Sequence, residues 1–342
     1  KGRHIRLAVA DTLEGPWRIH TPGVMPVEGS GFATRDIDPA DLDDAQMGPW
    51  RAATGGSFLY AHVASPDVHV DHDAGLVRMY YHGLCPDGEQ LTRLAVSGDG
   101  LAFTPASDVL GPPYFRAFTH GGHIYAVAWG GGLYRAMDWG GPFERGPDIF
   151  VGSPLHPEGT KMRHAAMRCQ GDELTVWFTR IGDCPERIVA VHLSLSADWH
   201  DWRINEVTEC LRPVHAWEGA DMPLLPSQTG AADGREFGLR DPCYFADNGR
   251  EFLLYAVAGE SGLAMAASAA VIARCSPDAS PVPIMALPIS RITERTSAKS
   301  RFIRPSLTIK SVMQATPEYN TWSAIPNASA NVVLSLAIRK RF

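Results

Sequence analysis

Histidines and carboxylates crowd into one short run of this sequence, "SPDVHVDHD" at residues 65–73. Such side chains can coordinate a metal ion or exchange protons with a bound molecule. Along a strand, however, Asp67, His69 and Asp71 share one face, and His72 and Asp73 precede an Ala-Gly pair typical of a turn. We therefore predict a strand that runs into a hairpin turn, not a metal site, and we retain only Asp67, near the start of the strand, as a chemical candidate.

A pattern of paired strands surrounds this run and repeats along the chain. Four segments alternate apolar residues, reach a small or acidic turn and then place an aromatic residue: 7–17, 94–103, 133–143 and 193–202. Four hairpins with an aromatic-rich second strand are found at 65–83, 114–131, 163–183 and 240–260. Two hairpins per unit, repeated about every 40–60 residues, are typical of four-stranded propeller blades.

These repeats predict an all-β protein, a five-bladed β-propeller at residues 1–267. Four units have both hairpins, whereas residues 4–20 supply only the outer hairpin of a first blade, which is incomplete at the N-terminus. The alternative is ring closure, in which residues 4–20 complete the last blade and leave four blades. We favour five.

The last 75 residues, 268–342, differ from the rest of the chain. They contain none of the glycines or histidines and carry ten Lys or Arg residues against three Asp or Glu residues. We predict either a basic, partly disordered tail or a frame-shifted segment, favour the second interpretation, and place no function there.

Composition excludes several classes of protein. The net charge of −7 argues against a partner made of duplex nucleic acid, and no apolar run is long enough to cross a membrane. The six cysteines lack CxxC spacing, which disfavours a structural zinc site. The first residue is Lys1, so a signal peptide or an N-terminal piece could be absent; the compartment is unknown, with cytoplasmic slightly favoured over secreted.

The inner strands of a propeller line its axis, so their first residues are the candidates for a site. Alignment of the four inner strands puts Ser65, Phe115, His164 and Asp241 in equivalent positions. Beside them are Asp67, Arg116, Arg163 and Arg240, with His62 just before the first strand. Arginine fork donors combined with carboxylates suit an oxygen-rich ligand.

The segment "RDPCYFADNGREFLLYAVAGESGLAMA" (240–266) resembles the blade motif of five-bladed glycoside hydrolases, the family 43-like arabinanase/xylosidase superfamily. "LAVSGDGLAF" and "ADTLEGPW" are similar to the outer-strand turns of that superfamily, so the resemblance covers residues 4–266. It implies hydrolysis of glycosidic bonds by a carboxylate and a carboxylic acid on opposite sides of the bond. It also raises a structural Ca²⁺ in the channel, with no other cofactor expected.

The resemblance assigns catalytic roles residue by residue. Asp241 matches the Asp-Pro start of a blade. In the blade that begins at Ser65, this serine stands where the aspartate would be, and Asp67 two residues later is a possible substitute. Glu158 or His164 would be the proton donor. His62, Arg116, Arg163 and Arg240 would bind a carbohydrate or another small polar ligand. Simpler interpretations remain open: Asp241 could cap a turn, Arg163 and His164 could form a structural pair, and Glu158 could be a solvated loop residue.

We therefore expect a glycoside hydrolase-like protein that acts on an oligosaccharide. The alternative is a non-catalytic propeller that binds a sugar or an anionic metabolite, because Ser65, Phe115 and His164 occupy positions where the superfamily would have more acids.

Overall fold

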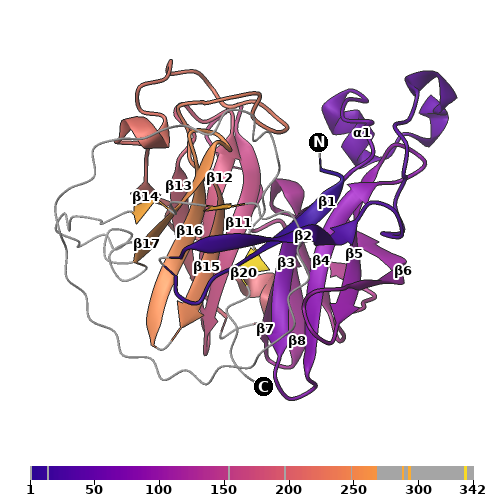
Figure 1. Cartoon of the computed structure of the whole chain (residues 1–342), viewed down its shortest axis with the longest axis horizontal. Helices are drawn as coiled ribbons and strands as arrows, with labels where there is room; N and C mark the ends of the chain where they lie inside the picture. The colour runs from indigo at the N-terminus through magenta and orange to yellow at the C-terminus, as the bar shows by residue number, and fades with distance from the viewer. Residues whose placement is uncertain are drawn as a thin grey trace.

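The protein is almost entirely β-structure in the computed structural model, which describes residues 2–13, 15–152, 155–195, 198–247 and 249–267 and the backbone of three two-residue strands further on. The described strands form five four-stranded sheets (Figure 1). A single short α-helix, α1 (Pro49–Thr54), lies among the described residues, and none of the helices described there has the length and apolar character needed to span a bilayer.

Four of the sheets are antiparallel blades in which each strand pairs with the next along the chain. The first contains β3 (Val63–Asp71), β4 (Leu76–Leu84), β5 (Gln90–Ser97) and β6 (Thr104–Gly111). The second contains β7 (Arg116–His120), β8 (His123–Val127), β9 (Leu133–Ala136) and β10 (Glu144–Arg145). The third contains β11 (Lys161–Gln170), β12 (Glu173–Ile181), β13 (Ile188–Ser194) and β14 (Thr208–Leu211). The fourth contains β15 (Arg240–Asp247), β16 (Arg250–Val257), β17 (Gly262–Ala267) and β18 (Leu287–Pro288).

The fifth sheet has a different pairing. Its centre is the antiparallel hairpin of β1 (His4–Val9) and β2 (Trp17–Pro26), flanked by β20 (Ser335–Leu336) and β19 (Ile292–Thr293), both in parallel pairing. A blade is an antiparallel meander, so this sheet does not count as one, and the propeller has four detected blades. The predicted five blades are not confirmed. The count of four agrees with the alternative prediction, but residues 4–20 do not complete the last blade, because β18 is the fourth strand there.

The blades stack because their strands are apolar on both faces. Along β12, Leu174, Val176 and Phe178 enter the core shared with the second blade, whereas Trp177 enters the core shared with the fourth blade. Successive side chains of a strand point to opposite faces, so one strand supplies two cores. This explains the near-continuous apolar runs of the inner hairpins.

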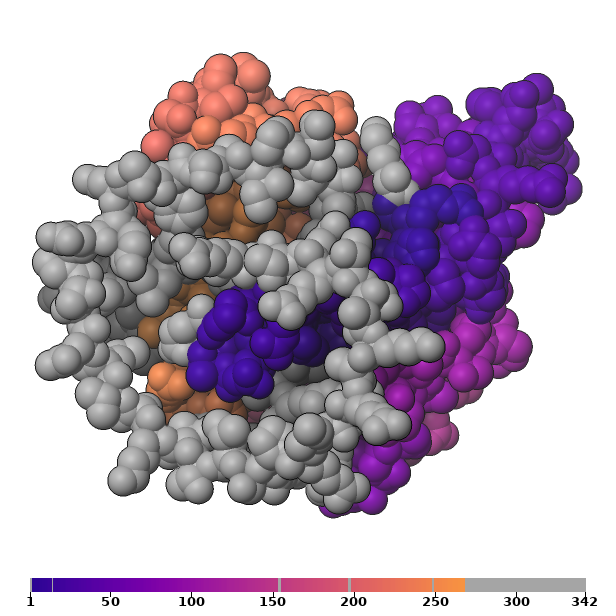
Figure 2. Space-filling model, in the orientation of Figure 1, coloured from indigo at the N-terminus to yellow at the C-terminus, as the bar shows by residue number. Residues whose placement is uncertain are grey.

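The β1–β2 hairpin joins the first blade to the last. Ile5 and Leu7 pack in the same core as Met79 of the first blade, and Leu13, at the hairpin tip, packs with Phe252 of the last. Figures 1 and 2 show this indigo hairpin reaching toward the orange strands. The hairpin thus closes the ring through side-chain packing. The predicted tail, 268–342, lies outside the described residues apart from three short strands, so the domain boundary at 267 stays a prediction.

Replacement of Trp177 by alanine should lower the free energy of unfolding by about 3–5 kcal/mol, because the ring is fully buried and stacks on Tyr244 of the next blade. Met137→Ala, at an exposed position, should change it by less than about 0.5 kcal/mol. Urea unfolding followed by fluorescence and circular dichroism measures both. Equal effects of the two substitutions would contradict the packing of the blades described above.

Candidate functional site

Three of the four inner strands each carry a β-bulge near their first residue. The pairing register slips between Ala64 and Asp67 in β3, between Met162 and Ala165 in β11, and between Arg240 and Cys243 in β15. Two residues of the inner strand then oppose one residue of its partner, which bends the strand and re-aims its side chains. The bulged pairs are Ser65–Pro66, Arg163–His164 and Asp241–Pro242.

The backbone has an unusual conformation near the start of three inner strands. Ser65, Tyr114 and Asp241 have φ of 49°, 68° and 50°, in the left-handed region that residues other than glycine rarely occupy. Each such residue costs of order 1–3 kcal/mol, and such strain concentrates at functional sites. These angles also correct the predicted alignment: Tyr114 takes the position given to Phe115, which is buried in the core between the first two blades. In the third blade the register makes Arg163 the equivalent of Asp241, and His164 follows it.

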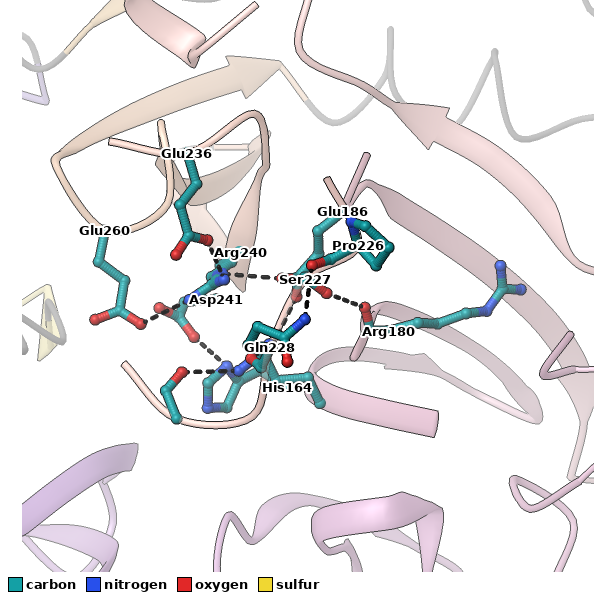
Figure 3. A network of polar contacts seen from close by, with 12 residues as sticks. His164, Arg180, Glu186, Pro226, Ser227, Gln228, Glu236, Arg240, Asp241 and Glu260 are labelled. Atoms are coloured by element: carbon teal, nitrogen blue, oxygen red, sulfur yellow. Dashed lines mark hydrogen bonds and ion pairs between the residues drawn. The ribbon is translucent and has the colours of Figure 1, made fainter. Parts of the chain in front are cut away.

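His164 and Asp241 meet, although they come from different blades. The imidazole Nδ1 forms an ion pair with the Asp241 carboxylate (Figure 3). Burial alone would raise the pKa of Asp241, but the His164 ring and the charges of Arg240 and Arg163 outweigh burial and lower that pKa to about 2. Asp241 is therefore an ionised carboxylate at neutral pH. The Nε2 of His164 is buried and has no hydrogen-bond partner among the described residues.

A second carboxyl group, that of Glu260, lies near this pair at the turn after β16. Burial and the negative charge of Asp241 raise the pKa of Glu260 to about 7, against the opposing charge of Arg240, whose Nη1 is 3.4 Å from Glu260 Oε1. Sequence reasoning missed Glu260. It stands in the quoted "AVAGESG", but nothing in those letters reports burial beside another acid.

Arg163 and Arg240 are held by a shared carboxylate. Glu186, only 1% exposed, accepts from Arg163 Nε at 2.8 Å through Oε1 and from Arg240 Nε at 2.9 Å through Oε2. The remaining nitrogens of Arg240 donate to Glu236 and Glu260 (Figure 3).

Arg163 also fixes the long connection between β14 and β15. Its Nη1 donates to the carbonyl of Gly230 at 3.0 Å, and its Nη2 donates to the carbonyl of Gln228. Every guanidinium nitrogen of Arg163 and Arg240 thus has an acceptor within the protein. Both were predicted to bind substrate, which stays a prediction; in this structure their donors are directed to acceptors of the protein itself.

A row of packed rings, three of them buried histidines, leads from His62 to His164. The ring centroids are 5.5 Å apart for His62 and His82, 4.4 Å for His82 and Tyr114, and 4.6 Å for Tyr114 and His164. Burial lowers the pKa of His62 and holds that of His82 far below its usual range, helped at His82 by the charges of His62, His164 and Arg116. Both histidines are therefore neutral at physiological pH. Sequence reasoning named His62 but not His82 or Tyr114.

Asp67 and Arg116 join the first two blades. Asp67 Oδ2 accepts from the backbone N–H of Ala117 at 2.7 Å and lies 2.8 Å from His69 Nε2. Burial pushes the pKa of Asp67 upward, but His69, Arg116 and the N–H of Ala117 together lower it. Arg116 Nη1 donates to the carbonyls of Ser65 and Phe115 at 3.1 and 3.0 Å.

The remaining sequence candidates lie elsewhere. Glu158 is exposed in a turn, and within the described part of the chain no hydrogen bond or ion pair connects it to the residues above. The solvated interpretation of Glu158 therefore fits its position. Asp71 binds Arg78 and caps the turn at Ala74, as the hairpin prediction required. Among the described residues, no three His, Cys, Asp or Glu side chains gather as metal ligands, so the calcium ion stays a prediction of the resemblance.

Glu186→Gln should lower the free energy of unfolding by about 3–5 kcal/mol, because it leaves the buried guanidinium groups of Arg163 and Arg240 without their shared carboxylate. The matched control is Glu144→Gln, which breaks the exposed pair with Arg135 and should cost less than about 1 kcal/mol. Chemical denaturation measures both. A loss for Glu186→Gln no larger than the control would contradict this account.

Glu260→Gln should become more stable relative to the wild type as pH rises. The pKa of Glu260 is higher in the folded than in the unfolded protein. Its contribution to the free energy of unfolding is therefore fully present below the unfolded pKa of 4.5 and is lost as pH rises through the folded pKa of about 7. Glutamine stays neutral, so the difference in unfolding free energy should shift in its favour by about 2–3 kcal/mol between pH 5 and 8.5. Urea midpoints across this range measure it, and a difference that does not vary with pH would show that Glu260 titrates normally.

Comparison with solved structures finds glycoside hydrolases at low sequence identity. The family-43 β-xylosidase/α-arabinofuranosidase CoXyl43 from a compost microbial metagenome is 11% identical, with 72% of each chain covered and a TM-score of 0.45. The endo-1,4-β-xylanase of Bacteroides thetaiotaomicron is 16% identical, covering 66% of this chain and 72% of its own, with a TM-score of 0.43. The α-L-arabinanase of Cellvibrio cellulosa is 10% identical, covering 65% and 78%, with a TM-score of 0.38. These TM-scores all lie below 0.5, so the fold is defined by the strand pairing of this chain alone.

No family model matches the chain. A curated viral protein, "Uncharacterized protein R118" of Acanthamoeba polyphaga mimivirus, is 33% identical over 274 residues, which cover 77% of this chain and 72% of the viral protein. Identity at this level over most of both chains indicates common descent. The chain belongs to the same family as this mimivirus protein.

Proposed function

We propose that the protein is a glycoside hydrolase-like enzyme in which Asp241 and Glu260 are the two reacting carboxyl groups. The observation that carries the proposal is the opposite shift of their pKa values, to about 2 for Asp241 and about 7 for Glu260. Glycosidic bond cleavage needs one ionised and one protonated carboxyl group at the same pH. Two acids whose environments separate their pKa values meet this need.

The proposed roles follow from the protonation states. Glu260, largely protonated up to about pH 7, would donate its proton to the leaving oxygen of the scissile bond. Asp241 would supply the negative charge that stabilises the positive charge developing on the sugar ring, acting on the anomeric carbon directly or through a water molecule. Arg240 holds Glu260 through the hydrogen bond from its Nη1 to Glu260 Oε1, and His164 holds Asp241 through its ion pair with that carboxylate.

The other predicted catalytic residues take different parts in this proposal. Asp67 is held by Ala117 and His69 and acts as a cross-blade anchor. His164 positions Asp241, and Glu260 replaces Glu158 as the proton donor because Glu158 is exposed outside the cluster.

Asp241→Asn and Glu260→Gln should each lower kcat/KM for a responsive aryl glycoside by about 10²-fold or more, since each removes one of the two reacting groups. In the wild type, kcat/KM should fall as pH rises above about 7, where Glu260 loses its proton. Glu251→Gln is the matched control in the same blade, because the partners of Glu251 are Arg168, Gln170 and Tyr244, outside the proposed reacting pair. Hydrolysis of a panel of nitrophenyl glycosides across pH 5–9 measures all of these.

A second candidate function is non-catalytic binding of a sugar or an anionic metabolite. It is favoured by the partners that both carboxyl groups already have, His164 for Asp241 and Arg240 for Glu260. Saturable sugar binding by folded wild-type protein, without turnover anywhere in the panel, would select this function and reject the enzyme. Unchanged turnover in both variants would also reject the assignment of Asp241 and Glu260.

A further inference from the structure

Arg116 is a buried arginine without a carboxylate partner of its own. It is 9% exposed, and only its Nη1 is bound, to two backbone carbonyls. Its Nε and Nη2 have no acceptor among the described residues, and no carboxylate forms an ion pair with it there. Asp67 is close enough for its pKa to respond to Arg116, but its Oδ2 is occupied by Ala117 and His69. The charge of Asp67 thus lies near Arg116, but the Nε and Nη2 donors keep no acceptor in the described part of the chain, which is unfavourable at a buried position unless a ligand completes them.

Other unpaired polar atoms belong to side chains that pack on Tyr114, two residues before this arginine. His82 Nδ1, His164 Nε2 and Trp50 Nε1 are buried and have no hydrogen-bond partner among the described residues. All three side chains pack against the ring of Tyr114, two residues before Arg116, with centroid distances of 4.4, 4.6 and 6.5 Å. Buried polar atoms are rarely left unpaired, so their convergence on one aromatic ring points to a polar molecule that completes them.

The electrostatics around Arg116 fit a single negative charge. The lowered pKa values of His62 and His82 keep these rings neutral, and burial raises the pKa of Tyr114, so its phenol is neutral as well. The free Nε–Nη2 edge of a guanidinium is a planar pair of donors that matches a planar carboxylate. With Asp67 nearby and the His164 ring paired to Asp241, one guanidinium is a better complement to a singly charged carboxylate than to a doubly charged phosphate.

We propose that Arg116, His82 and His164 form an anion subsite that binds the carboxylate of a uronic-acid sugar beside Asp241 and Glu260. The inference rests on the proposed function in one respect: it names the substrate class of that same site. His164 links the two places, because its Nδ1 pairs with Asp241 while its Nε2 is open. Arg163 and Arg240 do not compete for the ligand, since their nitrogens are occupied within the protein.

Ligand-observed NMR titrations with D-glucuronate, D-glucose and D-glucose 6-phosphate at pH 7 test the subsite. Wild-type protein should bind glucuronate about tenfold or more tightly than glucose, and Arg116→Gln should abolish this preference. Arg116→Lys keeps the positive charge but lacks the planar pair of guanidinium donors, so this variant should also lose most of the preference for glucuronate. Arg93→Gln is the matched control, because Arg93 stacks on Phe32 outside the cluster, and it should keep the preference.

The outcomes separate the subsite from the proposed reaction, and circular dichroism establishes that each variant is folded. Equal binding of glucuronate and glucose by the wild type, or an unchanged preference in both Arg116 variants, would overturn the subsite. Tighter binding of glucose 6-phosphate than of glucuronate would overturn its assignment to a carboxylate. A uronate preference without any glycoside turnover would keep the subsite and remove the reaction. Turnover of neutral glycosides without a uronate preference would support the reaction and reject the subsite.

Discussion

The site depends on one buried carboxylate, that of Glu186. It lies between β12 and β13 and binds an arginine from the third blade, Arg163, and one from the fourth, Arg240. An ion pair with no access to water stabilises a structure only when its geometry is good and its remaining polar atoms are satisfied, and here each guanidinium nitrogen has an acceptor. Removal of this carboxylate would leave two buried cations side by side.

The same contacts determine the protonation of Asp241 and Glu260. Arg240 reaches Glu260 and lies next to Asp241 in the chain, so its position affects both pKa values. The strained backbone of Asp241 and the bulge after Arg240 turn these neighbouring side chains in different directions. Fold and chemistry are therefore coupled at the start of β15, where one residue anchors the blade and the next carries the charge.

Local sequence patterns predicted the repeating parts of the fold well. The alternation and turn residues located the inner hairpins of four blades, which the strand pairing confirms. Five blades were predicted because residues 4–20 look like an outer hairpin, but the parallel partners of that hairpin are not adjacent to it in sequence. Parallel pairing between distant segments leaves no local signal.

The candidate site was predicted only in part, for the same reason. Asp241, His164 and Arg116 were found because they begin inner strands, and the structure brings Asp241 and His164 close to Tyr114 and Arg116 close to His82. Glu260, Glu186 and His82 were missed because their importance comes from burial beside partners on other elements. The one-residue error at Phe115 came from a strained residue, Tyr114, whose φ cannot be read from its letter.

The β1–β2 hairpin gives the molecule a particular order of assembly. Leu13 meets Phe252 across about 240 residues of chain, so the loop-closure entropy of that contact is large, whereas each blade is built from neighbouring strands. Individual blades can therefore form from local contacts, and the ring gains rigidity only when its two ends join. Because Tyr114, His164 and Asp241 belong to three separate blades, the geometry between them is fixed at that last step, and chemical competence would arrive with closure.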